Sequence, residues 1–309
     1  MWWRAAWGLG LFVGSMAAGW ALARAGRMTE AQAGRLVRWV IKVPAPVMLC
    51  LAFWGMDLRR AEVWTLPIVG FLVSMSTLLP AFLYSRRAGF SAPQTGSFLS
   101  CAMFSNLGYL GAYTAFALYG ETAYALCVLY FMFFTPCFYT LGFSLAKHYG
   151  RRRDEAAAKP ALGDDLRLYP FLGMVAGSVL SLLGMVRPAW LSPVSHALIT
   201  TDTVLSLVAV GSQVLLVSPR RWLPPCLAMS AIKFLFTPLV AWLVASQLHL
   251  QGLPRFVVLL EASMPVGVSP LLLPLLFGLD RRLTNALWLF TTLASIPWLL
   301  LMLPLLPRL

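Results

Sequence analysis

Residues Asn106-Leu107-Gly108-Tyr109-Leu110-Gly111 interrupt an apolar stretch that is long enough to cross a membrane as one helix. A second such stretch, near the other end of the chain, is interrupted by Met264-Pro265-Val266-Gly267-Val268-Ser269-Pro270. Glycine and proline loosen or break helices, and in lipid every freed backbone group needs a partner inside the protein or in a water-lined cavity. Two breaks at corresponding places in two halves of a chain indicate the substrate site of a secondary transporter.

The composition places the chain in a membrane. Of its 309 residues, 60% are hydrophobic and 11% are charged, and the mean hydropathy is +0.77. A soluble domain of this length cannot bury so much apolar surface, and the short alternating segments of a transmembrane barrel are absent from the sequence. We therefore predict an all-α integral membrane protein with ten transmembrane helices. The expected spans are residues 5–23, 37–56, 63–84, 95–119, 122–146, 168–186, 195–217, 223–247, 254–278 and 283–305.

The net charge of +13 reflects membrane topology rather than nucleic-acid binding. Sixteen lysines and arginines fall in loops expected opposite the N-terminus, and six fall on the N-terminal side. The positive-inside rule then predicts a multi-pass protein of the cell inner membrane with both termini on the non-cytoplasmic side. The first span is expected to be retained rather than cleaved as a signal peptide, because one arginine precedes its apolar core and four follow it closely. The expected partners are a lipid bilayer and a substrate, and no nucleic acid.

No enzyme or metal site is expected. The five cysteines and three histidines lack metal-binding or redox spacing. The sequence contains neither a plausible catalytic set nor a phosphate-binding glycine loop, so transport driven directly by ATP is not expected either. We expect no cofactor, and the coupling ion, if the transporter uses one, is H⁺ or Na⁺.

One hydrophilic segment divides the chain into two sets of five spans. We predict a first five-helix repeat over residues 1–147, a cytoplasmic loop over 148–167, and a second five-helix repeat over 168–309. An odd number of spans per repeat makes the second repeat inverted, with a pseudo-two-fold axis in the membrane plane. The broken fourth and ninth helices are then expected to cross.

Traces of internal repetition support this division. The first span contains Gly10 and Gly14, and the sixth contains Gly173 and Gly177. Small residues at this spacing let two helix backbones approach closely. We expect both pairs to lie at helix-helix contacts.

The two breaks supply the candidate substrate-binding residues. Asparagine in the first break offers two donors and an acceptor for a carboxylate, and an interrupted helix leaves N–H groups near the membrane centre that favour an anion. An alternative reading makes Gly108 and Gly111 a helix-packing face, with Asn106 hydrogen-bonding across helices. The candidates are Ser105, Asn106, Gly108, Tyr109 and Gly111 from the first break, and Met264, Pro265, Val266 and Gly267 from the second.

Four further polar residues are candidates for coupling or for setting the charge of the site. Ionisable groups inside a membrane are candidates for function. Glu261, one turn before Pro265, could carry a proton, hold sodium, or pair with Lys233. Lys233 is expected to lie too deep to reach the membrane surface and could instead face an anionic substrate. Asp202 is expected near the outer end of the seventh span, where simple exposure explains it equally well, and Gln213 could serve the site or hydrogen-bond two helices.

The chain resembles the auxin efflux carrier family, which includes plant auxin exporters and bacterial malonate permeases. The resemblance covers nearly the whole chain, and its most specific element is the fourth-span motif together with a matched ninth span. The matching segments are Asn106-Leu107-Gly108-Tyr109-Leu110-Gly111, Glu261-Ala262-Ser263-Met264-Pro265, Phe277-Gly278-Leu279-Asp280, Lys233-Phe234-Leu235-Phe236-Thr237-Pro238 and Val43-Pro44-Ala45. One position departs from the family: Tyr113 stands where relatives usually carry proline, which leaves open how fully the fourth helix is broken.

The resemblance implies ten spans in two inverted repeats, with spans 1, 2, 6 and 7 as a scaffold and the rest as a transport domain that moves like an elevator. It also implies organic anions as substrates, while the related bile-acid symporter fold binds sodium near its crossover. We therefore predict a secondary transporter of a small organic anion, a carboxylate in the simplest case. The alternatives are a sodium-coupled symporter of an amphipathic acid and a membrane receptor that does not transport. The sequence leaves open the substrate, the direction of transport and the oligomeric state, a homodimer included.

Overall fold

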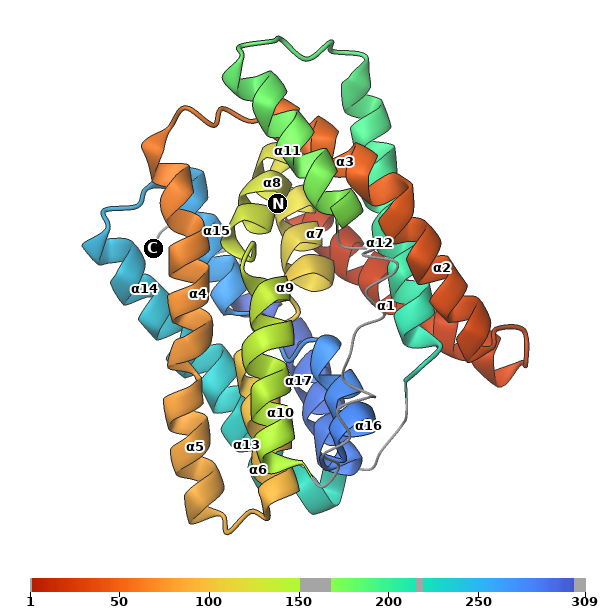
Figure 1. Cartoon of the computed structure of the whole chain (residues 1–309), viewed down its shortest axis with the longest axis vertical. Coiled ribbons are helices and arrows are strands. Elements are labelled where there is room, and N and C mark those ends of the chain that lie inside the picture. Colours follow the sequence, from red (N-terminus) through yellow and green to blue (C-terminus); the bar gives the residue numbers. More distant parts are fainter. Residues whose placement is uncertain (1, 151–167, 215–218, 303–309) are drawn as a thin grey trace. The chain divides into compact units, whose positions relative to one another are not determined.

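The computed structural model describes residues 2–150, 168–214 and 219–302, and these residues form helices and connecting turns without a strand. The predicted cytoplasmic loop at 148–167 lies, beyond Gly150, outside the described residues. Figure 1 shows the helices in chain order. Those before the loop are α1 (Trp2–Arg24), α2 (Glu30–Lys42), α3 (Pro44–Trp54), η1 (Ala61–Thr65), α4 (Leu66–Ser76), α5 (Leu78–Arg87), α6 (Ala92–Met103), η2 (Leu107–Ala112), α7 (Tyr113–Tyr119), α8 (Glu121–Tyr130), α9 (Phe134–Cys137), η3 (Phe138–Gly142) and α10 (Phe143–Tyr149). Those after it are α11 (Leu168–Leu182), α12 (Leu191–Gly211), η5 (Pro219–Trp222), α13 (Leu223–Ala231), η6 (Ile232–Phe236), α14 (Thr237–Gln247), α15 (Gly252–Ala262), η7 (Ser269–Leu272), α16 (Leu273–Phe277) and α17 (Arg281–Met302).

Six of the described helical segments are long and apolar enough to cross a membrane. They are Glu30–Trp54, Val63–Arg87, Glu121–Tyr149, Leu191–Gly211, Leu223–Gln247 and Arg281–Met302. The expected fourth and ninth spans are each divided into shorter helices, and the apolar helix at the expected sixth span is only Tyr169–Leu182. The multi-pass helical class is therefore supported, while the full set of ten spans stays a prediction.

The chain folds into two compact units, which do not follow chain order. Unit 1 contains residues 1–64, 108–128 and 161–214, and unit 2 contains residues 65–107, 129–160 and 215–309. Each unit takes segments from both predicted repeats, so this division is distinct from the repeat boundary. The chain passes from unit 2 to unit 1 directly after Leu107, in the middle of the expected fourth span.

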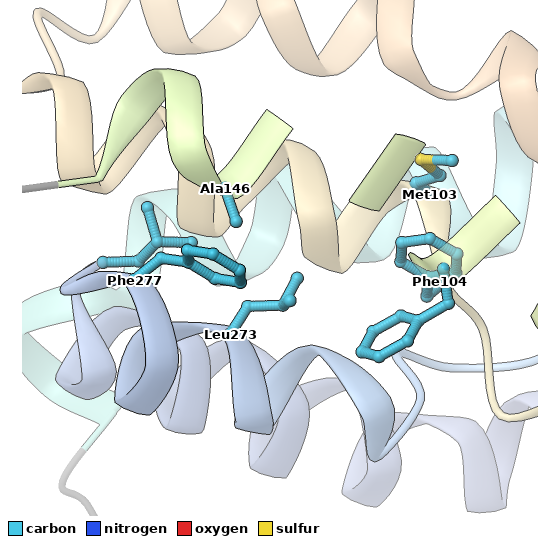
Figure 2. Packing of buried hydrophobic residues seen from close by; sticks show 7 residues of the cluster. Met103, Phe104, Ala146, Leu273 and Phe277 are labelled. Carbon is cyan, nitrogen blue, oxygen red and sulfur yellow. The ribbon is translucent and has the colours of Figure 1, made fainter. Parts of the chain in front are cut away.

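In unit 2, a hydrophobic cluster joins the two interrupted spans to the fifth. Phe104, just after α6, packs with Phe138 of η3, and Leu273 and Phe277 of α16 pack with Ala146 of α10 in the same cluster (Figure 2). The rings of Phe104 and Phe138 meet edge to face with their centroids 5.1 Å apart, which is a favourable aromatic geometry. This packing holds the ends of both broken helices in one unit.

In unit 1, the glycines of the expected sixth span bring two helices into close contact. A Cβ on Gly173 would lie 2.0 Å from the Pro46 carbonyl oxygen, and one on Gly177 would lie 2.2 Å from that of Cys50. Only glycine permits this approach, because no real Cβ comes so near a backbone oxygen. α11 accordingly packs along α3, as the spacing of the two glycines predicts (Figure 1).

The first span behaves differently from the prediction. Gly10 and Gly14 have nothing within 4 Å of an added Cβ, so the predicted contact at this pair is wrong. Gly19 makes the contact instead, because its added Cβ would lie 2.0 Å from the Val208 carbonyl oxygen of α12. α1 is rotated so that Gly19 faces α12, and Gly10 and Gly14 lie outside this interface.

An ion pair with little solvent exposure ties the start of α8 to the segment before α12 in unit 1. The guanidinium of Arg187 donates to the carboxylate of Glu121, to the Leu51 carbonyl oxygen at 2.7 Å and to the Ser192 hydroxyl at 2.7 Å. The side chains of Arg187 and Glu121 are 13% and 8% exposed. The other carboxylate oxygen of Glu121 lies 3.1 Å from Nε2 of His196. This cluster closes one end of the unit with charge-assisted hydrogen bonds.

We predict that Arg187→Met lowers the free energy of unfolding by about 3 kcal/mol, because it leaves the Glu121 carboxylate buried without its main partner. The matched control is Arg60→Met, which removes an ion pair with Asp57 whose side chains are 74% and 59% exposed. This change should reduce the same free energy by at most about 1 kcal/mol. Denaturant unfolding in detergent measures both. Equal effects of the two substitutions would contradict a stabilising role for the Arg187 pair.

Candidate functional site

The fourth expected span is broken just before the glycine motif rather than within it. α6 ends at Met103, and Phe104 takes an extended conformation with φ −109° and ψ 109°. The motif itself is wound as the π-helix η2, Leu107–Ala112. Glycines loosen the winding here without ending the helix, whereas the extended residues at 104–106 do end it. The helix is therefore interrupted despite Tyr113.

The ninth expected span is broken where the prolines predict. α15 ends at Ala262, residues 263–268 are non-helical, and the chain resumes as the short helices η7 and α16. Proline removes a backbone donor and clashes with the preceding turn, so Pro265 and Pro270 oppose a continuous helix. Both breaks lie in unit 2.

The two breaks pair with each other through their backbones. Ser105 and Val266 form an isolated antiparallel bridge. The N–H of Asn106 donates to the Pro265 carbonyl oxygen at 2.8 Å, and the N–H of Gly267 donates to the Phe104 carbonyl oxygen at 2.9 Å. Backbone groups released by one broken helix are thus satisfied by the other, as an apolar environment demands.

A residue from the last helix completes this pairing. The N–H of Val266 donates to the hydroxyl of Thr291 in α17 at 3.2 Å, and that hydroxyl donates to the Leu287 carbonyl oxygen at 2.8 Å. Thr291 was not among the residues predicted from the sequence. Buried polar residues of α17 recur at helical spacing, a signal that would have marked this face of the span. They are Thr284, Asn285, Thr291, Thr292 and Ser295.

Gly267 is required for the two broken segments to approach each other. A Cβ at this position would lie 2.7 Å from the Ser105 carbonyl oxygen and 3.0 Å from the Ser105 carbonyl carbon. Both atoms belong to backbone that is already held by the pairing, so they cannot move aside cheaply. The predicted binding residue Gly267 therefore has a structural role at the pairing.

Lys233 places a positive charge at the break of the fourth span. It lies in the π-helix η6, and its side chain is fully buried. Its ammonium donates to the Ala102 carbonyl oxygen and to the Ser105 hydroxyl, the latter at 2.8 Å. Thr77 donates to the same Ala102 oxygen at 2.9 Å. A cation is favourable at a helix C-terminus, where carbonyl groups lack intrahelical partners, and these bonds use two of the three ammonium donors.

The remaining predicted residues of unit 2 lie at or next to the pairing. Asn106 is 4% exposed, and Glu261 is fully buried in the last turn of α15. Met264, Pro265 and Val266 are buried as well. The structure thus brings Ser105, Asn106, Lys233 and the ninth-span break together in one unit.

Five other predicted residues belong to unit 1. Gly111 is buried and Gly108 is exposed, while Tyr109 is partly buried in η2. Asp202 lies near the middle of α12, Leu191–Gly211, rather than near its outer end as expected, because the helix starts earlier and stops sooner than the predicted span. Gln213 is exposed in the turn after α12 and joins neither polar group.

A metal site is not found in the described part of the chain, where no three histidine, cysteine, aspartate or glutamate residues are grouped suitably. The polar groups at or next to the pairing are an ammonium, an amide, hydroxyls and the single carboxyl of Glu261. Such groups suit an oxygen-rich anion better than a tightly held metal ion.

Comparisons with known proteins identify the family. The family described as "Membrane transport protein" matches residues 11–303, so the chain belongs to this family, that of the auxin efflux carriers. An uncharacterized transporter of Methanocaldococcus jannaschii is 24% identical over 269 residues, which is 83% of each chain. An uncharacterized transporter of Methanothermobacter thermautotrophicus is 23% identical over 280 residues, 90% of each chain. The chain is thus a membrane transporter and not an enzyme, and it works in a lipid bilayer on a transported substrate.

We predict that Gly267→Ala lowers the free energy of unfolding by about 1–3 kcal/mol and abolishes transport, because the added methyl group must separate the paired breaks. The matched control is Gly14→Ala in α1, where an added Cβ meets nothing within 4 Å. Denaturant unfolding in detergent and flux into reconstituted vesicles measure the two effects. Wild-type stability and flux in Gly267→Ala would show that the close approach at Ser105 is dispensable.

Proposed function

We propose that this protein is a secondary transporter that moves a small organic anion, a carboxylate in the simplest case, across the cytoplasmic membrane by elevator-type alternating access. The substrate site is the place where the broken fourth and ninth spans pair. The observation that carries the proposal is the backbone pairing of the two breaks beside the buried ammonium of Lys233.

The groups at the pairing match the chemistry of a carboxylate. The Asn106 amide offers two N–H donors, and the Lys233 ammonium has a donor beyond the two that bind Ala102 and Ser105. Hydrogen bonds from an ammonium to a carboxylate are about twice as strong as those between neutral groups. Glu261 is buried in the last turn of α15, next in sequence to the second break. An ionised Glu261 would oppose an anion, whereas a protonated Glu261 leaves the charge of Lys233 to the substrate.

The compact units support an elevator-like motion. Unit 1 holds α1, α2, α3, α11 and α12, which are the predicted spans 1, 2, 6 and 7 and correspond to the expected scaffold. Unit 2 holds both breaks and Lys233. Residues 108–128 group with the scaffold helices, so the chain links the two units immediately after the pairing. A crossing of inverted helices at this point offers two equivalent ways to close the site, which suits alternating access.

A second candidate is a sodium-coupled symporter of an amphipathic acid. It is favoured by an apolar pocket in unit 2 next to the residue that precedes Ser105. The pocket is lined by Gly70, Met75, Phe104, Tyr130, Phe134 and Cys137, among others. The free space inside it is only about 20 Å³, so the apolar body of a larger carboxylate enters only if these aromatic walls separate. Sodium-dependent thermal stabilisation that disappears in Glu261→Gln would favour this candidate.

We predict that carboxylates raise the thermal stability of the purified protein and that Lys233→Met weakens this binding about 10- to 100-fold, because a hydrogen bond from a charged donor is lost. Asn106→Ala should weaken it less, by about 3- to 10-fold, because its donor is neutral. Thermal-shift titrations with acetate, malonate, benzoate and indole-3-acetate, with and without sodium, measure the affinities. The matched controls are Lys147→Met and Gln213→Ala, since both residues are exposed and neither belongs to a break.

Vesicle flux then separates a transporter from a receptor. Counterflow of the stabilising anion is expected in the wild type, whereas binding without counterflow would support the receptor. Because Lys233 also holds the end of α6, Lys233→Met is judged only where its stability without anion shows that it is folded. Asn106→Ala provides the second test. Normal binding and transport in both variants would refute the site.

A further inference from the structure

A carboxylate with one buried oxygen lies in unit 1, away in sequence from the proposed substrate site. Asp202 is near the middle of α12, and its Oδ1 atom is buried without a hydrogen-bond partner among the described residues. The residue as a whole is partly exposed, so a proton can reach it. An ionised carboxylate with a buried and unpartnered oxygen is costly inside a membrane, and binding a proton or a cation removes that cost.

The neighbours of Asp202 are hydroxyl groups. The Tyr109 side chain interacts electrostatically with the Asp202 carboxyl and lies within side-chain hydrogen-bonding range of Ser206, which is one turn along α12. Tyr113, one turn after Tyr109, reaches Thr200 in the same way. The two tyrosines therefore connect η2 and α7 to the polar face of α12.

Tyr109 is the titratable group that interacts with the Asp202 carboxyl from a neighbouring helix. The helices packed against α12 are α1, α2, α3 and α7, and η2 adjoins α7. Their titratable groups are Arg24 of α1, Glu30, Arg35, Arg38 and Lys42 of α2, Cys50 of α3, Tyr109 of η2, and Tyr113 and Tyr119 of α7.

The arrangement suits a proton better than a metal cation. A hard cation needs a shell of several oxygen ligands, and the described residues contain no group of three histidine, cysteine, aspartate or glutamate side chains that could hold one here. A single proton removes the charge of the carboxyl and turns it into a donor for a neighbouring hydroxyl oxygen. Without that proton the carboxylate needs a donor, which the hydroxyl of Tyr109 or Ser206 can supply after it turns toward Asp202.

We infer that Asp202, with the hydroxyls of Tyr109 and Ser206, is the proton-binding site that couples transport to the proton gradient. The inference rests on the proposed transport function and names its coupling ion. The proton binds to the Asp202 carboxylate on one side of the membrane and leaves it on the other. Tyr109 follows Asn106 by three residues in the chain. A change in the hydrogen bonding of Tyr109 therefore acts on the short segment that connects it to the substrate site.

Two flux measurements in the same vesicles test the coupling. Labelled malonate and labelled indole-3-acetate are the probes. Asp202→Asn keeps the side chain's size and stays neutral, so it should retain counterflow without a pH gradient but lose accumulation driven by an imposed gradient. Tyr109→Phe should shift the pH dependence of counterflow, whereas the matched control Tyr113→Phe, whose hydroxyl meets Thr200, should not.

Proton binding is also measured without any substrate. Infrared difference spectra between high and low pH should contain a protonated carboxyl band that is lost in Asp202→Asn and retained in Glu261→Gln. This measurement separates the two hypotheses, because it gives a result even where no anion is transported. The absence of counterflow for every anion, with the Asp202 band present, would overturn the proposed function but not the proton site.

Three results would overturn the inference itself. The first is gradient-driven accumulation in Asp202→Asn at the wild-type level. The second is loss of counterflow together with accumulation in a folded Asp202→Asn protein, which would make Asp202 part of the substrate site or of the structure. The third is an infrared band that disappears in Glu261→Gln and remains in Asp202→Asn.

Discussion

The fold of unit 2 depends on one constraint: backbone groups released inside an apolar protein must find partners there. Both broken spans release such groups, and each satisfies the other, through Asn106 with Pro265 and Gly267 with Phe104. Thr291 takes up the remaining Val266 donor. A break in either span alone would leave N–H and carbonyl groups unpaired, and each unpaired group in an apolar environment costs several kcal/mol. The two interruptions are therefore stable only together.

The same constraint explains how a lysine can be fully buried in this unit. α6 ends inside the protein, where its last carbonyl groups need donors, and Lys233 and Thr77 supply them at Ala102. The ammonium is stabilised by the carbonyl groups at the helix end and by its hydrogen bond to the Ser105 hydroxyl, but its charge has no counter-ion in these contacts. An anion that enters the site would supply that counter-ion. Lys233 thus contributes both to anion binding and to the stability of the broken helix. Occupancy of the site is therefore linked to the geometry of the pairing.

The sequence predicted features that depend on local chemistry. Prolines and glycines located the ninth-span break, and the spacing of Gly173 and Gly177 located a close helix contact. It did not predict features that depend on distant partners. α6 ends before the motif because the residues after it pair with residues far along the chain. Gly10 and Gly14 make no close contact because of the way α1 is rotated against α12. Asp202 lies nearer the middle of its helix than the predicted span placed it, because an apolar stretch does not mark where a helix begins or ends within it.

The fourth-span motif serves two polar groups at once. Ser105 and Asn106 belong to the paired breaks of unit 2, whereas Tyr109 meets Asp202 and Ser206 in unit 1. Only Leu107 and Gly108 separate them, and these residues begin a π-helix, a winding that is rarer and less stable than an α-helix. Coupling between two sites requires an element with alternative arrangements that both sites bias. A π-wound segment with glycines at two positions meets that requirement, since rewinding it by one residue would turn Tyr109 relative to Asn106. The glycines of the motif are therefore explained by the need for a segment that can be rewound, since the helix break itself lies before them.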